Sequence, residues 1–415
     1  MNTSDVDGND RVMLFCPSVG VWDIDGDYYF DRKFYDGLLA YCSRWPGEIR
    51  LAIRAEKREP PQFGLIRYEQ REFPASLVLL AFDEKISAKY LQDASIVFAS
   101  GDNHKNLHLA SLCSKSGVKC VYCIEYILET RLQIALLTHK RLMRRIKCVV
   151  WLLLMELKRR REFRLSDGLM SNGVPAYNQY RKLIGKTLLY FDTRTTEKTI
   201  ITEKELNEKL EYLDRNLPLR LGFSGRLIGM KGVDHLVEVA RELNKKKVPF
   251  TLDIFGGGDM VPLLIERIHL YGLSDKVILR GVVDFSKELV PYVKSSIDLY
   301  VVCHLQSDPS CTYLETYACG VPIAGYDNRA HQGILNICDV GWSSPMKDVP
   351  RLAELIRRLH ENRGEIKRKS INAKKFAEEH TFEKTTKRRI SYIEGVLNAE
   401  ESCASPVSAL SKAVK

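Results

Sequence analysis

The stretch LRLGFSGRLIGMKG at residues 219–232 joins a short apolar run to a glycine-rich turn. Leu219–Ser224 has the length and composition of a buried strand, and Gly225 then lets the backbone turn tightly. Arg226 and Lys231 follow five residues apart. At the carboxyl end of a parallel strand such a turn can hold an anion, with Arg226 forking onto phosphate oxygens and Lys231 adding a point charge. The fragment also fits a plain glycine-rich turn with solvated cations, and alone it leaves both interpretations open.

Strand-length apolar runs alternate with helical patterns on both sides of this turn, among them a predicted helix at 29–45 and a predicted strand at 187–190. This alternation is typical of parallel β-α-β units. Two Rossmann-like, doubly wound α/β domains in series are therefore predicted. A polar, charged stretch separates them and ends at Pro218. The predicted organisation is an N-terminal domain at 1–196, a linker at 197–217, a second domain at 218–375, a terminal helix at 376–398 and a disordered tail at 399–415.

Composition narrows the function classes. With 45% hydrophobic and 28% charged residues, the 415-residue chain is neither disordered nor collagen-like. Between Arg131 and Arg164 stand eleven Lys and Arg against Glu156 and Glu162, a local net charge of +9 out of +10 for the whole chain. A nucleic-acid binder more often spreads its positive charge over a domain surface. An anionic membrane or lipid partner is therefore favoured over nucleic acid.

The basic stretch 140–164 interrupts its charges with the apolar run VVWLLL at 149–154. A basic, apolar helical surface suits docking on an anionic inner leaflet. The alternative is a helix that buries this run in its own core and solvates its cations, and the sequence leaves both open.

Signals for export and membrane insertion are missing from the pattern. The longest apolar run, Cys148–Met155, is eight residues long, against about 20 needed to span a bilayer. The N-terminus lacks a basic segment and a cleavage site. Eleven scattered Cys residues fit reduced thiols in a cytoplasm. No ligand spacing predicts a metal site, and we expect a cytoplasmic protein, peripheral on the inner face of the membrane if the basic stretch docks there.

A second motif, QSDPSCTYLE at 306–315, follows a predicted strand and opens a predicted helix. Its small residues would aim backbone N–H groups at a bound diphosphate, helped by the helix dipole. Glu315 in the first turn could accept hydrogen bonds from two ribose hydroxyls. However, Thr312 and Glu315 also have the spacing of a capping box, which uses the same carboxylate for structure.

Together these stretches resemble a known family. FSGRL…KG at 223–232, FGGG at 255–258 and LETYACGVPI at 314–323 are similar, in order and spacing, to the donor half of a retaining glycosyltransferase of family 4 (glycosyl transferases group 1). The likeness covers about residues 219–359. It implies a GT-B fold, in which two Rossmann-like domains face each other across a cleft. The terminal stretch 376–392 resembles the helix that crosses back to the first domain in that family.

The resemblance also implies roles for individual residues. Arg226 and Lys231, positioned by Gly225, correspond to the cations that neutralise the donor diphosphate. Glu315 corresponds to the second Glu of the family's Glu-x7-Glu motif, which holds the nucleotide ribose. Two fixed cations and a helix N-terminus would stabilise the departing diphosphate without a metal. We therefore expect a UDP- or GDP-linked sugar as substrate and no cofactor.

Further positions are assigned on the same ground. Cys311 and Thr312 occupy the loop whose amides meet the phosphate, and Arg280 matches the loop near the nucleobase. Ser307 stands where the family usually has its first Glu, which contacts the transferred sugar, with Asp308 beside it. Asp308 could substitute for that Glu, recognition of the sugar could differ, or the protein could have lost transfer.

The first domain offers fewer signals. Gly20 follows the first strand, where the family has a glycine loop near donor and acceptor. Asp102 and His104 follow the strand where many members place a catalytic-domain His, although a His opening a helix is more often a solvated surface residue. Glu125 matches a position that lines the acceptor cleft. We assign His104 to catalysis beside Arg226 and Lys231, and Asp102 and Glu125 to the acceptor side.

The expected function is retaining transfer of a sugar to a growing, lipid-linked glycan in the assembly of a bacterial surface polysaccharide such as O-antigen, capsule or exopolysaccharide. A nucleotide-sugar epimerase shares the two-domain architecture and is the rival within enzymes. A non-catalytic GT-B protein that binds a nucleotide sugar or a partner enzyme is the rival from another class, motivated by Ser307.

Overall fold

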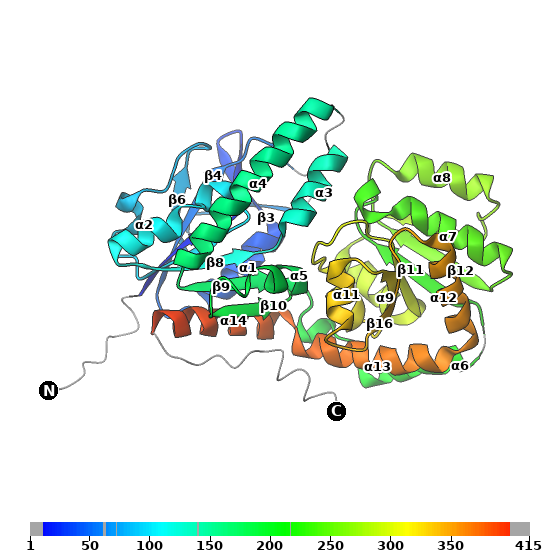
Figure 1. Ribbon diagram of the computed structural model, residues 1–415. Coiled ribbons are helices and arrows are strands. Elements are labelled where there is room, and N and C mark those ends of the chain that lie inside the picture. Colours follow the sequence, from blue (N-terminus) through cyan, green and yellow to red (C-terminus); the bar gives the residue numbers. More distant parts are fainter. Residues whose placement is uncertain (1–10, 61–63, 72, 139–140, 216, 399–415) are drawn as a thin grey trace.

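The computed structural model describes residues 11–60, 64–71, 73–138, 141–215 and 217–398. They form two α/β domains lying side by side (Figure 1). Each domain is built on a largely parallel sheet with helices against it. The predicted fold class is therefore confirmed.

The sheet of the first domain has a parallel core whose order is β10-β9-β8-β7-β1-β4. Strand β2 pairs with the carboxyl end of β4 and leads into an antiparallel extension through β3 and β5, while β6 pairs with β4. Two hydrophobic clusters fill the space on either side of the sheet. The strands are β1 (Val12–Cys16), β2 (Gly20–Ile24), β3 (Asp27–Asp31), β4 (Glu48–Ala55), β5 (Leu65–Arg67), β6 (Ser76–Leu80), β7 (Ile96–Ser100), β8 (Lys119–Ile124), β9 (Gly168–Asn172) and β10 (Thr187–Tyr190). The helices are α1 (Arg32–Cys42), η2 (Ala88–Leu91), η3 (His104–Asn106), α2 (Leu109–Ser116), α3 (Leu128–Thr138), α4 (Leu142–Leu165) and α5 (Gly173–Tyr180).

A hairpin replaces part of a helix that the sequence predicts at 29–45. Strands β2 and β3 pair through a turn in which Asp25 and Gly26 both have positive φ, 55° and 87°. Asp-Gly is the residue pair that such two-residue hairpin turns favour. The helix begins only at Arg32, where the Asp31 side chain accepts a hydrogen bond from the Phe34 N–H.

The sheet of the second domain is parallel throughout, in the order β13-β12-β11-β14-β15-β16. Because β11 lies centrally and the strand order reverses beside it, its carboxyl end is the place where doubly wound folds bind ligands. The strands are β11 (Leu219–Ser224), β12 (Phe250–Phe255), β13 (Val277–Gly281), β14 (Leu299–Val302), β15 (Ile323–Tyr326) and β16 (Gly341–Ser344). The helices are η4 (Glu197–Thr199), α6 (Glu203–Asp214), η5 (Gly229–Lys231), α7 (Val233–Lys245), α8 (Val261–Leu270), η6 (Phe285–Leu289), α9 (Val290–Ser296), α10 (Thr312–Ala318), α11 (Arg329–Leu335), α12 (Val349–Glu361), α13 (Arg363–Glu379) and α14 (Phe382–Leu397).

The stretch 197–217, predicted as a linker, contains a well-capped helix. Thr202 and Glu205 form a capping box at the start of α6, which packs against α9 and α13 of the second domain. Leu206 and Leu213 are buried in this contact. The polar composition of α6 concealed its amphipathic spacing.

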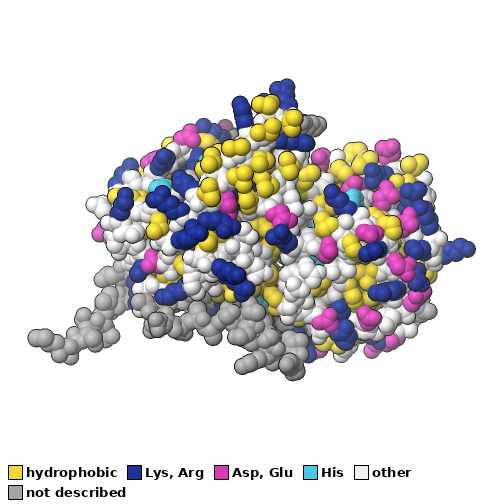
Figure 2. All heavy atoms as spheres, viewed as in Figure 1, with side chains coloured by type: hydrophobic (Ala, Val, Ile, Leu, Met, Phe, Trp, Pro, Cys, Tyr) yellow, Lys and Arg dark blue, Asp and Glu magenta, His cyan; other side chains and the backbone are white. Residues whose placement is uncertain are grey.

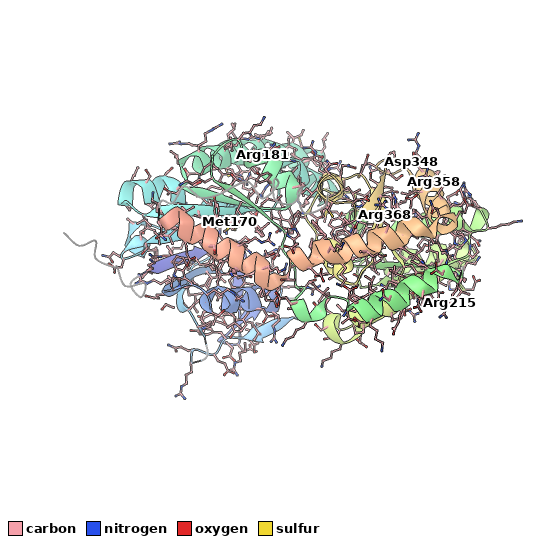
Figure 3. All side chains as sticks on the ribbon, turned by 90° about the horizontal axis from the view of Figure 1, so that it is seen from below. Met170, Arg181, Arg215, Asp348, Arg358 and Arg368 are labelled. Atoms are coloured by element: carbon pink, nitrogen blue, oxygen red, sulfur yellow. The ribbon has the colours of Figure 1, made fainter. Side chains whose placement is uncertain are left out.

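The last two helices run along the underside of both domains (Figure 3). Helix α13 packs on α10 in the second domain, and α14 packs on α1 and on β8, β9 and β10 in the first. Tyr392 fixes α14 there, because its hydroxyl donates to the Lys186 carbonyl at 2.6 Å and accepts the Leu169 N–H at 2.9 Å. The predicted tail at 399–415 lies outside the described residues.

Candidate functional site

Arg226 is held at the carboxyl end of β11 by two glycine loops that touch. The Gly225 N–H donates to the Phe255 carbonyl at 3.1 Å, and a Cβ on Gly256 would lie 1.9 Å from the Gly225 carbonyl oxygen. The Leu227 N–H donates to the Gly257 carbonyl at 2.9 Å. The loops after β11 and β12 can therefore approach this closely only because Gly256 has no side chain.

The Arg226 side chain is exposed and has no hydrogen bond or ion pair to any residue that the structure describes. It lies near Tyr126 of the first domain: burial raises the pKa of that phenol above its usual range, and the Arg226 charge opposes the rise. An uncompensated guanidinium thus faces the first domain and is available to an anion.

Lys231 is buried beside Arg226 and forms an ion pair. Its Nζ donates to Asp308 Oδ2 at 3.1 Å, and both side chains are buried. Asp308 Oδ1 is buried without a hydrogen-bond partner. The neighbouring Ser307 Oγ accepts the backbone N–H of Arg329 at 3.2 Å, so this position supports the start of α11. Ser307, at the position of the family's first Glu, has no carboxylate, whereas its neighbour Asp308 has one.

Glu315 is buried in the first turn of α10 and pairs with Arg194 from the connection between the domains. Arg194 Nε donates to Glu315 Oε1 at 2.8 Å, and the guanidinium carbon lies 4.0 Å from the centre of the Phe285 ring. The capping-box alternative is wrong, because the N-cap of α10 is Cys311 and no side chain caps it. Glu315 Oε2 has no hydrogen bond within the described part of the chain, which leaves this oxygen for a ligand hydroxyl.

A cation from the first domain reaches the other end of the same loop. Lys33 Nζ on α1 donates to Asp192 Oδ2 at 2.6 Å and to Cys311 Sγ at 3.0 Å. Although burial opposes ionisation of Asp192, the Lys33 ammonium lowers the pKa of this carboxyl below its usual value. Cys311, predicted in the phosphate loop, therefore lies where the two domains meet.

The first domain presents a carboxyl group to this meeting point. Burial, together with the charges of Asp102 and Asp192, raises the pKa of Glu125 to about 8. Because its pKa is raised, Glu125, which follows β8, is mostly protonated at neutral pH. Asp102 is committed to structure: its carboxylate accepts the backbone N–H groups of Glu125 and Tyr126 at 2.8 and 3.0 Å and pairs with Arg131. Asp102 thus holds the backbone that carries Glu125.

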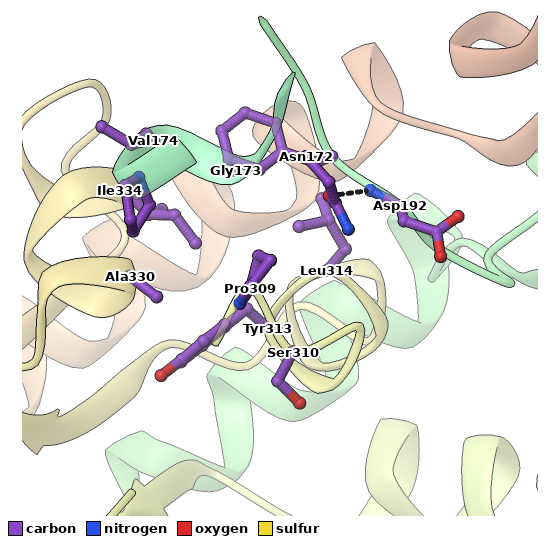
Figure 4. Close-up of a pocket in the computed structure, with 12 residues that line it drawn as sticks. Asn172, Gly173, Val174, Asp192, Pro309, Ser310, Tyr313, Leu314, Ala330 and Ile334 are labelled. Atoms are coloured by element: carbon purple, nitrogen blue, oxygen red, sulfur yellow. Dashed lines mark hydrogen bonds between the residues drawn. The ribbon is translucent and has the colours of Figure 1, made fainter. Parts of the chain in front are cut away.

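The seam between the domains is close-packed beside these groups. Figure 4 shows a pocket lined from both sides, with Asn172–Val174 and Asp192 of the first domain facing Pro309 and Leu314 of the second. Gly173 has a φ of +77°, and a Cβ there would lie 2.6 Å from Pro309 Cβ. The Asp192 N–H donates to Asn172 Oδ1 at 3.0 Å. A salt bridge of 2.6 Å between Arg329 and Glu129 closes the same seam.

The remaining predicted residues lie around this centre. Gly20 opens β2, and a Cβ there would lie 2.9 Å from the Arg54 carbonyl, so strand pairing accounts for this glycine. His104 is exposed in η3, where its ring stands edge-on to Trp151 at 5.2 Å. Arg280 is the last residue but one of β13, and its guanidinium donates to Asp253 at 2.8 Å and to the Tyr292 hydroxyl at 2.9 Å. Thr312 begins α10 and accepts from Ser310. The roles assigned to these four residues stay predictions.

Three residues of the site escaped the sequence analysis: Lys33, Asp192 and Arg194. Lys33 lies 278 residues from its partner Cys311, and no local pattern marks it. Asp192 and Arg194 follow directly after a predicted strand at 187–190. Polar residues at the carboxyl end of a strand are the signal that could have found them.

Metal-ligand clusters and membrane-spanning helices are both absent from the described residues. No three His, Cys, Asp or Glu side chains there gather into a group that could hold a metal ion. Likewise, no helix in the described ranges has the length and apolar composition to cross a membrane.

Comparisons with known proteins bear on the second domain and on the fold. Residues 202–376 match the family described as glycosyl transferases group 1. The alpha-D-kanosaminyltransferase of Streptomyces kanamyceticus is 27% identical over 155 residues, which cover 37% of this chain and 39% of that protein. The 2-deoxystreptamine glucosyltransferase of the same organism is 25% identical over 145 residues, 34% of this chain and 35% of its own. The chain thus matches about two fifths or less of these relatives.

One solved structure is similar over nearly the whole chain. Anabaena Alr3699/HepE in complex with UDP has a TM-score of 0.61 at 13% identity, covering 93% of this chain and 99% of its own. At this identity the likeness shows the fold alone. The chain therefore contains a glycosyl transferases group 1 domain and has the GT-B fold.

Proposed function

We propose that the protein transfers a sugar from a UDP- or GDP-linked donor to a glycan acceptor, with retention of anomeric configuration. The observation that carries this proposal is the unpaired guanidinium of Arg226, fixed by the Gly225–Gly256 contact at the carboxyl end of β11. A group 1 domain match and a relative named for kanosaminyl transfer support the reaction class. HepE, a protein of the same fold, is described in complex with UDP.

In this proposal the donor diphosphate lies between Arg226 and the start of α10. Arg226 forks onto phosphate oxygens. Lys231 has three N–H donors and uses one on Asp308, so that two remain for the diphosphate. Glu315 Oε2 accepts from a ribose hydroxyl while Arg194 holds the other oxygen. Asp308 Oδ1 takes the place of the family's first Glu toward the sugar.

Transfer breaks the bond between the anomeric carbon and the donor phosphate oxygen and forms a bond from that carbon to an acceptor oxygen. The acceptor hydroxyl proton passes to the departing diphosphate. The cations stabilise the negative charge that develops on this leaving group. Glu125 is protonated at neutral pH and can therefore donate a hydrogen bond to the acceptor. No metal or other cofactor takes part in this scheme.

We infer that the acceptor is a lipid-linked glycan at the cytoplasmic face of a membrane, in surface polysaccharide assembly. A neighbour of the same fold is described as the lipopolysaccharide outer core galactosyltransferase WaaB; it has a TM-score of 0.63 at 12% identity, covering 94% of this chain and 100% of its own. That likeness concerns the fold, so the acceptor class is an inference for experiment to test.

The test measures release of UDP or GDP from UDP-glucose, UDP-N-acetylglucosamine and GDP-mannose in the presence of lipid-linked glycans extracted from bacterial membranes. We expect turnover of one donor, reduced at least about 100-fold in Arg226→Ala. Arg358→Ala is the matched control, because Arg358 is an exposed arginine on α12 of the same domain (Figure 3). Equal turnover by both variants would contradict the proposed site, and an inverted linkage in the product would contradict retention.

A non-catalytic protein of the same fold is the second candidate, favoured by the structural use of Ser307. It predicts that the donor binds without turnover across all acceptors. Interconversion of the donor sugar without an acceptor would instead indicate an epimerase.

A further inference from the structure

Helix α4 buries charged side chains and exposes apolar ones, which is the reverse of the usual arrangement. Helices at a protein surface normally bury their apolar face and expose their charges. Here the buried face carries Glu156, Arg159 and Glu162 beside Leu152 and Phe163. Arg159 Nη1 lies 2.8 Å from Glu156 Oε2, its Nε donates to the Gly101 carbonyl at 3.0 Å, and Glu162 accepts the Ser111 N–H at 3.0 Å. The hydrogen bonds of Arg159 and Glu162, together with the buried Phe163 ring, thus attach α4 to the domain.

The opposite face of α4, with the end of α3, exposes a continuous apolar surface. Leu142 and Leu157, at the two ends of the helical stripe, are 69% and 67% exposed. Figure 2 shows hydrophobic side chains gathered over this part of the molecule, with Lys and Arg around them. We call it the α3–α4 surface, made by Leu136, Leu137, Leu142, Met143, Ile146, Val150, Trp151, Leu153, Leu154 and Leu157. The alternative in which this run is buried in the chain's own core is wrong.

The exposed charges of α4 have one sign. Helix α4 contains eight Lys and Arg, and its two acids, Glu156 and Glu162, are both buried in the contacts above. Two copies meeting through this surface would bring like charges together, which is unfavourable. An anionic bilayer complements both properties, because its headgroups attract the cations and its acyl boundary accepts the apolar side chains.

The α3–α4 surface also adjoins the first-domain side of the candidate site. Trp151 on the surface touches His104 at 5.2 Å between ring centres, and His104 begins η3, two residues after Asp102. We propose that the α3–α4 surface inserts into an anionic lipid bilayer and thereby holds this side of the cleft against the membrane. The consequence for the acceptor rests on the proposed function: a lipid-linked glycan would enter along Trp151 and His104.

The experiment measures binding of the full chain to vesicles of phosphatidylcholine alone and of phosphatidylcholine with about 30 mol% phosphatidylglycerol, whose anionic headgroups give the surface a negative potential. We expect at least about tenfold tighter binding to the anionic vesicles. A tenfold difference in affinity corresponds to about 1.4 kcal/mol. The triple variant Val150→Ser, Leu154→Ser, Leu157→Ser removes three apolar side chains. Its affinity for the anionic vesicles should fall about tenfold or more.

Two comparisons make this test specific. The variant Ile265→Ser, Leu270→Ser removes exposed apolar side chains from α8 of the other domain and should bind vesicles like the wild type. The variant Lys158→Gln, Arg161→Gln, Arg164→Gln spares the buried Arg159 and should lose its preference for anionic vesicles. Thermal unfolding of each variant shows that it is folded.

Insertion has its own signal. Vesicles with brominated acyl chains should quench tryptophan fluorescence in the wild type and much less in Trp151→Phe. The proposal would be overturned if the wild type does not bind anionic vesicles, or if the triple variant binds them as well as the wild type does. A wild-type dimer that the triple variant dissociates would assign the surface to a second copy instead. Vesicle binding requires no nucleotide, so its failure is separate from failure of the proposed sugar transfer.

Discussion

Replacing Gly256 by Ala should damage the candidate diphosphate site without touching any charged residue. The new Cβ would lie 1.9 Å from the Gly225 carbonyl oxygen, whereas ordinary contact begins at 3.4 Å. The two loops must therefore separate by about 1.5 Å. Gly256 also has a φ of +124°, a conformation that residues with a side chain rarely adopt.

The magnitude follows from the position of Arg226 directly after Gly225. A guanidinium displaced by more than an ångström loses charge-assisted hydrogen bonds to the diphosphate, worth about 1.5–3 kcal/mol. The Kd for UDP, or for GDP if that is the nucleotide bound, should then rise about 10- to 150-fold. The strained backbone should lower the free energy of unfolding by about 1–3 kcal/mol.

Calorimetric titration with nucleotide measures the first effect and urea denaturation the second. Gly229→Ala is the matched control, since it lies in the same motif and its Cβ would meet no atom within 4 Å. It should bind nucleotide like the wild type. A folded Gly256→Ala protein whose Kd stays within about twofold of wild type would refute the role of the glycine contact.

Three further substitutions test other parts of the structure. Asp102→Asn weakens a pair with Arg131 and should lower the free energy of unfolding by about 1–3 kcal/mol in urea, with UDP affinity unchanged. Glu125 holds its proton up to about pH 8 in the folded chain against an ordinary 4.5, so stability should fall as pH rises between these values. Glu125→Gln should flatten that fall, and an unchanged pH profile would contradict the raised pKa. Arg159→Ala leaves Glu156 buried with one partner fewer and should lower the free energy of unfolding, measured in urea, by about 3 kcal/mol. Substitution of an exposed arginine should change it very little.

Features that depend on neighbours in sequence could be predicted from it. One turn contains Gly225, Arg226 and Lys231, and the strand before it has a plain apolar pattern. The fold class and the position of Arg226 at the end of a strand could therefore both be predicted. The Asp25-Gly26 turn carried a local signal of the same kind, but the aromatic residues after it fit a helix equally well, and the helix was predicted too early.

Features that depend on tertiary pairing could not be predicted in the same way. Thr312 and Glu315 have the spacing of a capping box, yet Arg194, 121 residues away, takes the carboxylate. A charge-assisted hydrogen bond to the buried Glu315 carboxylate outweighs a local cap because it satisfies a charge that would otherwise be desolvated. The apolar run in α4 was ambiguous for a related reason, since its exposure depends on tertiary hydrogen bonds that orient the helix, from Arg159 to Gly101 and from Ser111 to Glu162.

The central claim is that the loop between β11 and η5 binds a nucleotide diphosphate through Arg226. Calorimetric titration of the purified chain with UDP and with GDP, beside Arg226→Ala and the control Arg358→Ala, tests it most directly. The structure predicts that one nucleotide binds to the wild type and to Arg358→Ala, and that this binding is lost in Arg226→Ala. Binding of neither nucleotide to the folded wild type, or equal binding to both variants, would contradict the claim.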